Sequence, residues 1–92
     1  MEYNRLLFNA IVDETKLKNS DGQFVWITEY LGYLPFGQYQ WLEINNEDIS
    51  NNFEFYWDYN DLVKLNELGL LIKISEENLS DDNKRIKYKI NV

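Results

Sequence analysis

The 92-residue chain contains no cysteine and no histidine, and these two absences exclude several kinds of chemistry. Without cysteine there is neither a disulfide framework nor a thiol nucleophile, which fits a reducing compartment. Without histidine there is no imidazole general base, and zinc sites of the thiolate or imidazole type are excluded as well. The chain also lacks a glycine-rich phosphate loop. We therefore expect a protein that is not an enzyme and that binds neither a metal ion nor a cofactor.

Long hydrophobic runs and targeting segments are also missing. No apolar run approaches the roughly 20 residues that a membrane-spanning helix requires. The N-terminal sequence MEYNRLLFNAIVDETK has a short apolar patch, but it has no basic segment before the patch and no small-residue cleavage site. We therefore expect a cytoplasmic protein that does not associate with a membrane.

Positive charge is absent from the centre of the sequence. Between Asn19 and Val63 there are eight acidic residues and no Lys or Arg, and the whole chain has a net charge of −7. The same segment holds twelve of the fifteen aromatic residues. Aromatic side chains can bury roughly 150–250 Å² each, and they can replace the disulfides or metal that small domains often need. The central segment thus supplies both core side chains and the excess negative charge.

Hydrophobic periodicity predicts a single domain over residues 1–92. Helical spacing of apolar residues predicts an amphipathic helix over 3–17, and QYQWLEI at 38–44 alternates as a strand does. Residues 23–31 allow two interpretations. A capping-box spacing and a following glycine favour a helix, whereas the aromatic and β-branched residues of FVWIT favour a strand. The helix is slightly favoured.

The C-terminal part of the chain predicts a helix followed by a β-hairpin. Leucines at core spacing indicate a helix near 59–68, with Asp58 or Asn60 as its cap and a glycine as its terminator. The segments 70–76 and 85–91 alternate polar and apolar residues on either side of a polar loop. The expected fold class is α+β, with an N-terminal helix, a short antiparallel sheet, a second helix and a C-terminal hairpin.

The aromatic stretch FEFYWDY at 53–59 has the period of two that is typical of an extended strand. One face holds four aromatic residues that we expect in the core: Phe53, Phe55, Trp57 and Tyr59. The other face holds Glu54, Tyr56 and Asp58, and we expect these side chains on the surface.

The acids of the central segment give the favoured functional hypothesis. If the fold gathers them on one exposed face, their field would steer a basic partner and compete for a site that receives phosphates. An exposed aromatic residue beside them, Tyr56 with Tyr39 or Trp41, would supply a binding anchor. The candidate partner-binding residues are Glu43, Glu47, Asp48, Glu54, Tyr56, Asp58 and Asp61.

A basic cluster near the C-terminus gives the alternative. Residues 58–92, with NDLVKLNELGLLIKI leading into KRIKYKINV, resemble the helix and wing that end a winged-helix domain. The resemblance implies a nucleic-acid-binding or regulatory module whose contacts would be Lys84, Arg85, Lys87 and Lys89. Because the preceding helix is acidic, which opposes phosphate binding, we expect nucleic acid only at the hairpin.

In size, acidity and lack of catalytic residues, the chain is similar to the small acidic inhibitors of phages and mobile elements, including anti-CRISPR proteins. This similarity implies a protein that binds and blocks a basic, nucleic-acid-handling protein partner. The hypothesis depends on the central acids lying together on an exposed face.

Overall fold

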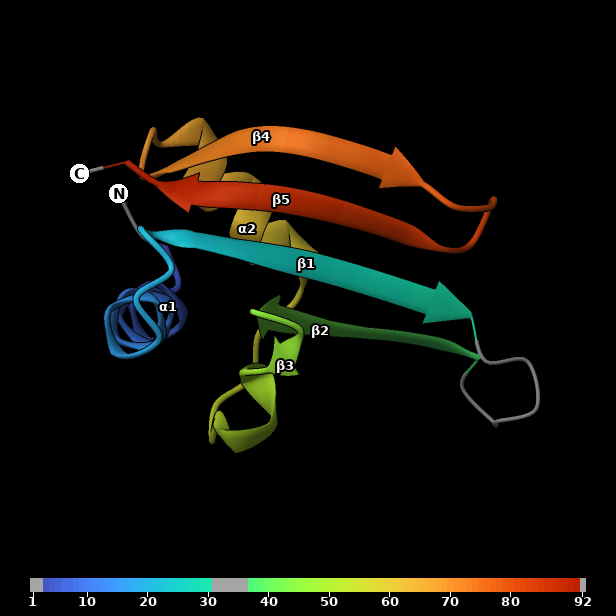
Figure 1. The fold of residues 1–92 in the computed structure, drawn as a ribbon. Coiled ribbons are helices and arrows are strands. Elements are labelled where there is room, and N and C mark those ends of the chain that lie inside the picture. Colours follow the sequence, from blue (N-terminus) through green and yellow to red (C-terminus); the bar gives the residue numbers. More distant parts are fainter. Residues whose placement is uncertain (1–2, 31–36, 92) are drawn as a thin grey trace.

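In the residues that the computed structural model describes, 3–30 and 37–91, five antiparallel strands form one sheet that carries two α-helices on one face (Figure 1). The elements are, in chain order, α1 (Arg5–Leu17), β1 (Gln23–Tyr30), β2 (Gln38–Ile44), β3 (Glu47–Asp48), the 3₁₀ turn η1 (Ser50–Asn52), α2 (Tyr59–Glu67), β4 (Leu71–Asn78) and β5 (Lys84–Ile90). The strand order across the sheet is β3-β2-β1-β5-β4. The predicted α+β class and its order of helices and strands are confirmed.

One face of the sheet forms the core with the two helices. Alternate residues of the strands point toward α1 and α2, and their side chains form one buried cluster. The helices contribute Leu7, Ile11, Leu62 and Leu65, and the strands contribute Phe24, Trp26, Leu42, Ile44, Leu71, Ile86, Tyr88 and Ile90. The intervening strand residues point to the opposite face, which carries no described helix. On that face Ile27 is nevertheless buried, between its cross-strand neighbours Trp41 and Arg85.

The helical interpretation of residues 23–31 is wrong. Residues 23–30 form β1, which lies in the middle of the sheet between β2 and β5, and residue 31 lies outside the described residues. A central strand has neighbours on both sides and buries side chains on both faces, as Phe24 and Ile27 do here. Aromatic and β-branched residues fit such a pleated surface. Ser20 caps no helix, because its hydroxyl has no hydrogen-bond partner among the described residues. Its N–H donates to the carbonyl of Thr15 in the last turn of α1.

The aromatic stretch FEFYWDY does not form a strand. Residues 53–58 connect η1 to α2 without a strand partner among the described residues, and Tyr59 is the first residue of α2. The expected alternation of half-buried and exposed side chains holds over residues 53–57 but not at Asp58, which is half-buried, and the rings lie at the border of the core. The half-buried aromatic side chains that pack against it are Phe53, Phe55, Trp57 and Tyr59. Tyr56 is 81% exposed, and Glu54 is exposed as well.

α2 lies where a helix near 59–68 is predicted, and it spans Tyr59–Glu67 with Leu68 as its C-cap. Asp58 is its N-cap, and it forms a capping box with Asp61, since each side chain accepts a hydrogen bond from the other residue's N–H. Gly69 follows the helix in the left-handed region, with φ +80°. The N–H of Leu70 then donates to the carbonyl of Leu65 over 3.0 Å, which completes a Schellman motif.

The remaining predicted elements are also present. The helix expected over 3–17 is α1, with Asn4 as its N-cap, and the strand expected over 38–44 is β2. The segments 70–76 and 85–91 form the hairpin of β4 and β5. Within the described part of the chain, neither helix has the length and apolar character needed to cross a membrane.

Candidate functional site

The outer edge of β2 is only partly covered. β3 has two residues and pairs with Glu43 and Ile44, at the C-terminal end of β2. The preceding residues, 38–41, pair with β1 on one side. On the other side they have no strand neighbour within residues 3–30 and 37–91. This part of β2 is therefore an open sheet edge.

Two hollows meet at Gln40 on this edge. The first has a volume of about 300 Å³ and is lined by Gln40, Trp41, Asp48, Ser50, Asn51 and Trp57. The second has a volume of about 370 Å³, and its lining includes Gln40, Trp26, Tyr39, Asp58 and Tyr59. Each hollow thus combines aromatic rings with one carboxylate. We call this region the β2-edge surface and define it by Gln40, Trp41, Asp48, Trp57, Asp58 and Tyr59.

Asp48 is held in place by the turn that follows it. Its Oδ1 accepts hydrogen bonds from the N–H of Ser50 at 2.9 Å, the hydroxyl of Ser50 at 2.8 Å and the N–H of Asn51 at 3.2 Å. These donors fix the carboxylate at the start of η1, as a capping residue does. The chain therefore presents a positioned negative charge next to Trp57.

Asp58 is held by the start of α2. One oxygen of its carboxylate accepts the N–H of Asp61 at 3.3 Å, and the other accepts the hydroxyl of Tyr56 at 3.0 Å. The hydrogen bond from Tyr56 to Asp58, together with the negative charge of Asp58, raises the pKa of the Tyr56 phenol above its ordinary value of 10.0. Tyr56 is therefore neutral at physiological pH and is oriented by the same carboxylate that lines the second hollow.

The other five predicted partner-binding residues do not line the two hollows of the β2-edge surface. Glu43 lies opposite Asp48 in the β2–β3 pair and accepts the indole N–H of Trp41 at 2.7 Å. Glu47 forms an ion pair with Lys18 at 3.1 Å, so its charge is matched by α1. Asp61 serves the capping box. Glu54 is exposed, with no hydrogen bond or ion pair to another described residue. Of the seven predicted residues, Asp48 and Asp58 are the two that line the hollows of the open edge.

The basic residues of β5 are divided between the two faces of the sheet. Lys84 shares the core face with Ile86 and lies 3.6 Å from Glu76 of β4. Arg85, Lys87 and Lys89 alternate with these residues and lie on the helix-free face. Lys89 is 3.9 Å from Asp21, whereas no carboxylate of the described residues lies within 4.0 Å of Arg85 or Lys87.

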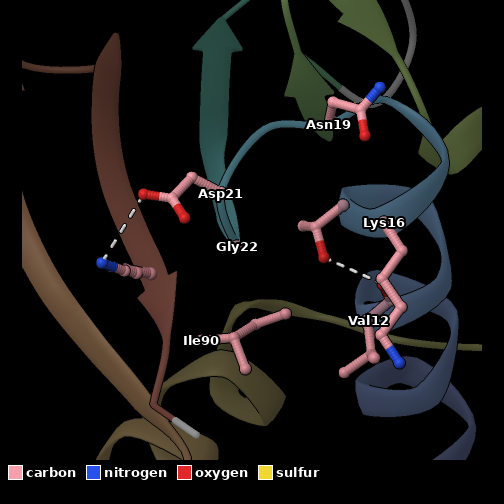
Figure 2. A pocket seen from close by; sticks show the side chains of 8 residues that line it. Val12, Lys16, Asn19, Asp21, Gly22 and Ile90 are labelled. Atoms are coloured by element: carbon pink, nitrogen blue, oxygen red, sulfur yellow. Dashed lines mark hydrogen bonds and ion pairs between the residues drawn. The ribbon is translucent and has the colours of Figure 1, made fainter.

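A larger hollow lies between the end of α1 and the adjoining ends of β1 and β5 (Figure 2). It has a volume of about 680 Å³. Val12 and Lys16 of α1 face Asp21 and Ile90 across it (Figure 2). The hydroxyl of Thr15, which also lines the hollow, donates its hydrogen bond to the carbonyl of Val12 at 2.9 Å and so does not donate to a ligand. Its one carboxylate, Asp21, is already paired with Lys89, and its described lining residues include no aromatic ring, so we do not place the functional site there.

Three members of the β2-edge surface are not identified as binding residues from the sequence, and Tyr59 is one of them, because the sequence predicts it in the core. Trp57 is expected in the core, and Gln40 has no chemistry that marks it. The one available signal is the alternation of glutamine with aromatic residues in QYQW, since polar residues at alternate positions are typical of a partly exposed strand.

Carboxylates do not form a metal site in the described part of the chain. Within residues 3–30 and 37–91, no group of three or more acidic residues is arranged so that it could hold a metal ion. Comparison of this chain with protein-family models, with curated proteins and with solved structures finds no match.

Proposed function

We propose that this is a small non-enzymatic binding protein that recognises a basic protein partner through the β2-edge surface. The observation that carries the proposal is the position of Asp48 and Asp58, which line adjacent hollows beside aromatic rings at an open sheet edge. Lys and Arg side chains have an apolar stem and a charged end, so they suit a surface of this composition. Their cations also interact favourably with the faces of Trp and Tyr.

The local geometry supports a stable recognition surface. Both carboxylates are oriented by hydrogen bonds within the chain, so that little side-chain freedom would be lost on binding. Glu47 and Asp21 are paired with Lys18 and Lys89, so the wider negative field that would raise the rate of encounter with a basic partner comes from the other acids between Asn19 and Val63. A partner that uses Lys and Arg to bind phosphates would bind this surface in competition with nucleic acid. The proposed consequence is that the protein blocks such a partner.

The test uses a partner that is captured from a cell lysate and then purified. Its affinity is measured for the double variant Asp48→Asn and Asp58→Asn. This variant removes the two charges, and each Asn keeps a side-chain oxygen that can accept the same backbone N–H groups. The matched control is Asp13→Asn with Glu67→Gln, which removes two exposed charges elsewhere. We expect at least about a tenfold loss of affinity in the first variant, or about 1.4 kcal/mol, and a small change in the control.

Two results would contradict the proposal. Equal losses of affinity in the two double variants would mean that binding depends on the net charge of the protein and not on the β2-edge surface. An unchanged affinity in both would mean that the partner binds elsewhere. The competition is checked separately, by adding duplex DNA to the complex and measuring whether it displaces the protein.

A second candidate function rests on the helix-free face of the sheet. Arg85 and Lys87 lie there beside the apolar residues Val25 and Ile27 of β1. Glu77 of β4 lies opposite Arg85 in the sheet, but no carboxylate of the described residues lies within 4.0 Å of either cation. We propose nucleic-acid binding as the alternative use of this face. It predicts that duplex DNA binds at low salt, that binding weakens as salt rises, and that Arg85→Glu with Lys87→Glu abolishes it. If that pattern appears while Asp48→Asn with Asp58→Asn has no effect on any interaction, the alternative replaces the first proposal.

A further inference from the structure

The backbone of β2 offers unused hydrogen-bonding groups at the open edge. The N–H of Leu42 donates to the Ser50 hydroxyl at 3.2 Å, and its carbonyl accepts the N–H of Ile49 at 2.9 Å. Both groups of Leu42 therefore point away from β1. In an antiparallel strand, every second residue points its N–H and carbonyl to the same side, so Gln40 also directs both groups outward. No hydrogen bond joins either group to another described residue.

The two edges of the sheet differ in how they are protected. On β4, the register with β5 shifts between Lys73 and Ser75, so a bulge interrupts the strand. Charged side chains also follow this edge, including the ion pair of Lys73 with Glu76. Bulges and charges are the usual means of preventing another strand from pairing. Within the described part of β2, Gln40 and its neighbours have neither a bulge nor a lysine.

We infer that the partner supplies an extended segment that adds to the sheet as a strand beside Gln40, with basic side chains directed into the two hollows. This inference rests on the proposed function, because it specifies how the β2-edge surface would be occupied. An added strand lies about 4.8 Å from its neighbour, and its successive side chains point to opposite faces. Asp48 and Trp41 line one hollow, Asp58 and Tyr59 line the other, and Gln40 belongs to both. Basic side chains of the added strand that enter the two hollows would therefore each meet a carboxylate and an aromatic ring.

A second copy of this chain is the less favourable occupant. Pairing two β2 edges would bring the Asp48 and Asp58 carboxylates of both copies together, and like charges at an interface are unfavourable. A basic segment from another protein has the complementary charge. It would also satisfy the N–H and carbonyl of Gln40, which strand addition requires.

The experiment uses the full chain and a short synthetic peptide of Val and Thr with two adjacent lysines at its centre. Binding is followed by the NMR shift of the Gln40 amide during titration. Two further peptides carry N-methyl groups, one at the odd-numbered positions and the other at the even-numbered positions. In an added strand only one of these two sets of N–H groups would face β2, so only one peptide loses them. We expect the parent peptide to shift the Gln40 amide, and one N-methylated peptide to bind at least about tenfold more weakly than the other.

A pair of variants checks the same point from the protein side. Gln40→Pro removes the outward N–H, whereas Gln40→Ala removes the same side chain and keeps the N–H. Proline is tolerated where a strand N–H faces away from the sheet, so the fold should persist. We expect the proline variant to lose peptide binding and the alanine variant to retain it. If the proline variant does not fold, the N-methylated peptides decide the question alone.

The outcomes separate this inference from the proposed function. If Asp48→Asn with Asp58→Asn weakens peptide binding but neither N-methylated peptide differs from the parent, the surface binds basic segments and strand addition is wrong. If N-methylation weakens binding and the charge variant does not, strand addition stands and charge recognition at this surface is wrong. If the peptide produces no shift at Gln40, the inference is overturned. Self-association of the chain that Gln40→Pro abolishes would instead identify a second copy as the occupant.

Discussion

Asp58 both caps α2 and supplies one of the two carboxylates of the β2-edge surface, and substitutions can separate these roles. Asp58→Ala removes the side-chain acceptor for the N–H of Asp61, a hydrogen bond of 3.3 Å, and leaves the return bond from the N–H of Asp58 in place. Loss of an N-cap costs about 1 kcal/mol, within a range of roughly 0.5–2 kcal/mol. Loss of the negative charge at the helix N-terminus adds about 0.3–1 kcal/mol. Asp58→Asn keeps a capping oxygen, so it should lose only the charge contribution.

The assay is urea denaturation followed by tryptophan fluorescence. A small domain has an m-value of about 1–3 kcal/mol/M in urea, so Asp58→Ala should lower the midpoint by about 0.5–2 M. Asp58→Asn should lower it by less than half as much. Equal destabilisation by the two substitutions would refute the reasoning, because charge and not cap geometry would then account for the effect. No change in either variant would mean that the capping box contributes nothing to stability.

Two further predictions concern neighbouring features of the fold. Gly69 has φ +80°, and an added Cβ would have open space around it. Gly69→Ala should therefore lower the free energy of unfolding only by the backbone strain of the left-handed region, about 1–2 kcal/mol, and Gly69→Asn should lower it by less. Equal urea midpoints for the wild type and the two variants would contradict this. The pKa of Tyr56 is raised above 10.0 by Asp58, so the stabilisation from their hydrogen bond should be present below pH 10 and be lost as the pH rises through the folded-state pKa. The Tyr56 pKa is measured from tyrosinate absorbance, with Tyr56→Phe as the control that identifies its contribution. It should be lower in an Asp58→Asn background, and an unchanged pKa would contradict the prediction.

The sequence by itself determined the elements whose signals are local. Asp58, one of the two predicted caps, and the left-handed Gly69, the predicted terminator, bound α2, because caps act through hydrogen bonds within a few residues. The hairpin follows from two alternating segments around a polar loop. The alternation between half-buried and exposed side chains over residues 53–57 also followed from the sequence, since an extended chain turns successive side chains to opposite sides. Asp48 and Asp58 were identified as candidates from the charge pattern alone.

Only the tertiary structure decided the features that depend on distant partners. Residues 23–30 are a strand because β2 and β5 lie on both sides of them, and this pairing overrides a local capping signal. The segment 53–58 has the pattern of a strand but no partner, so it remains outside the sheet. The open edge at Gln40 exists because the two-residue β3 ends before it, and no property of Gln40 records where a neighbouring strand stops. Backbone pairing between strands is non-local, so the position of a sheet edge, and of any site built on it, is fixed only when the chain has folded.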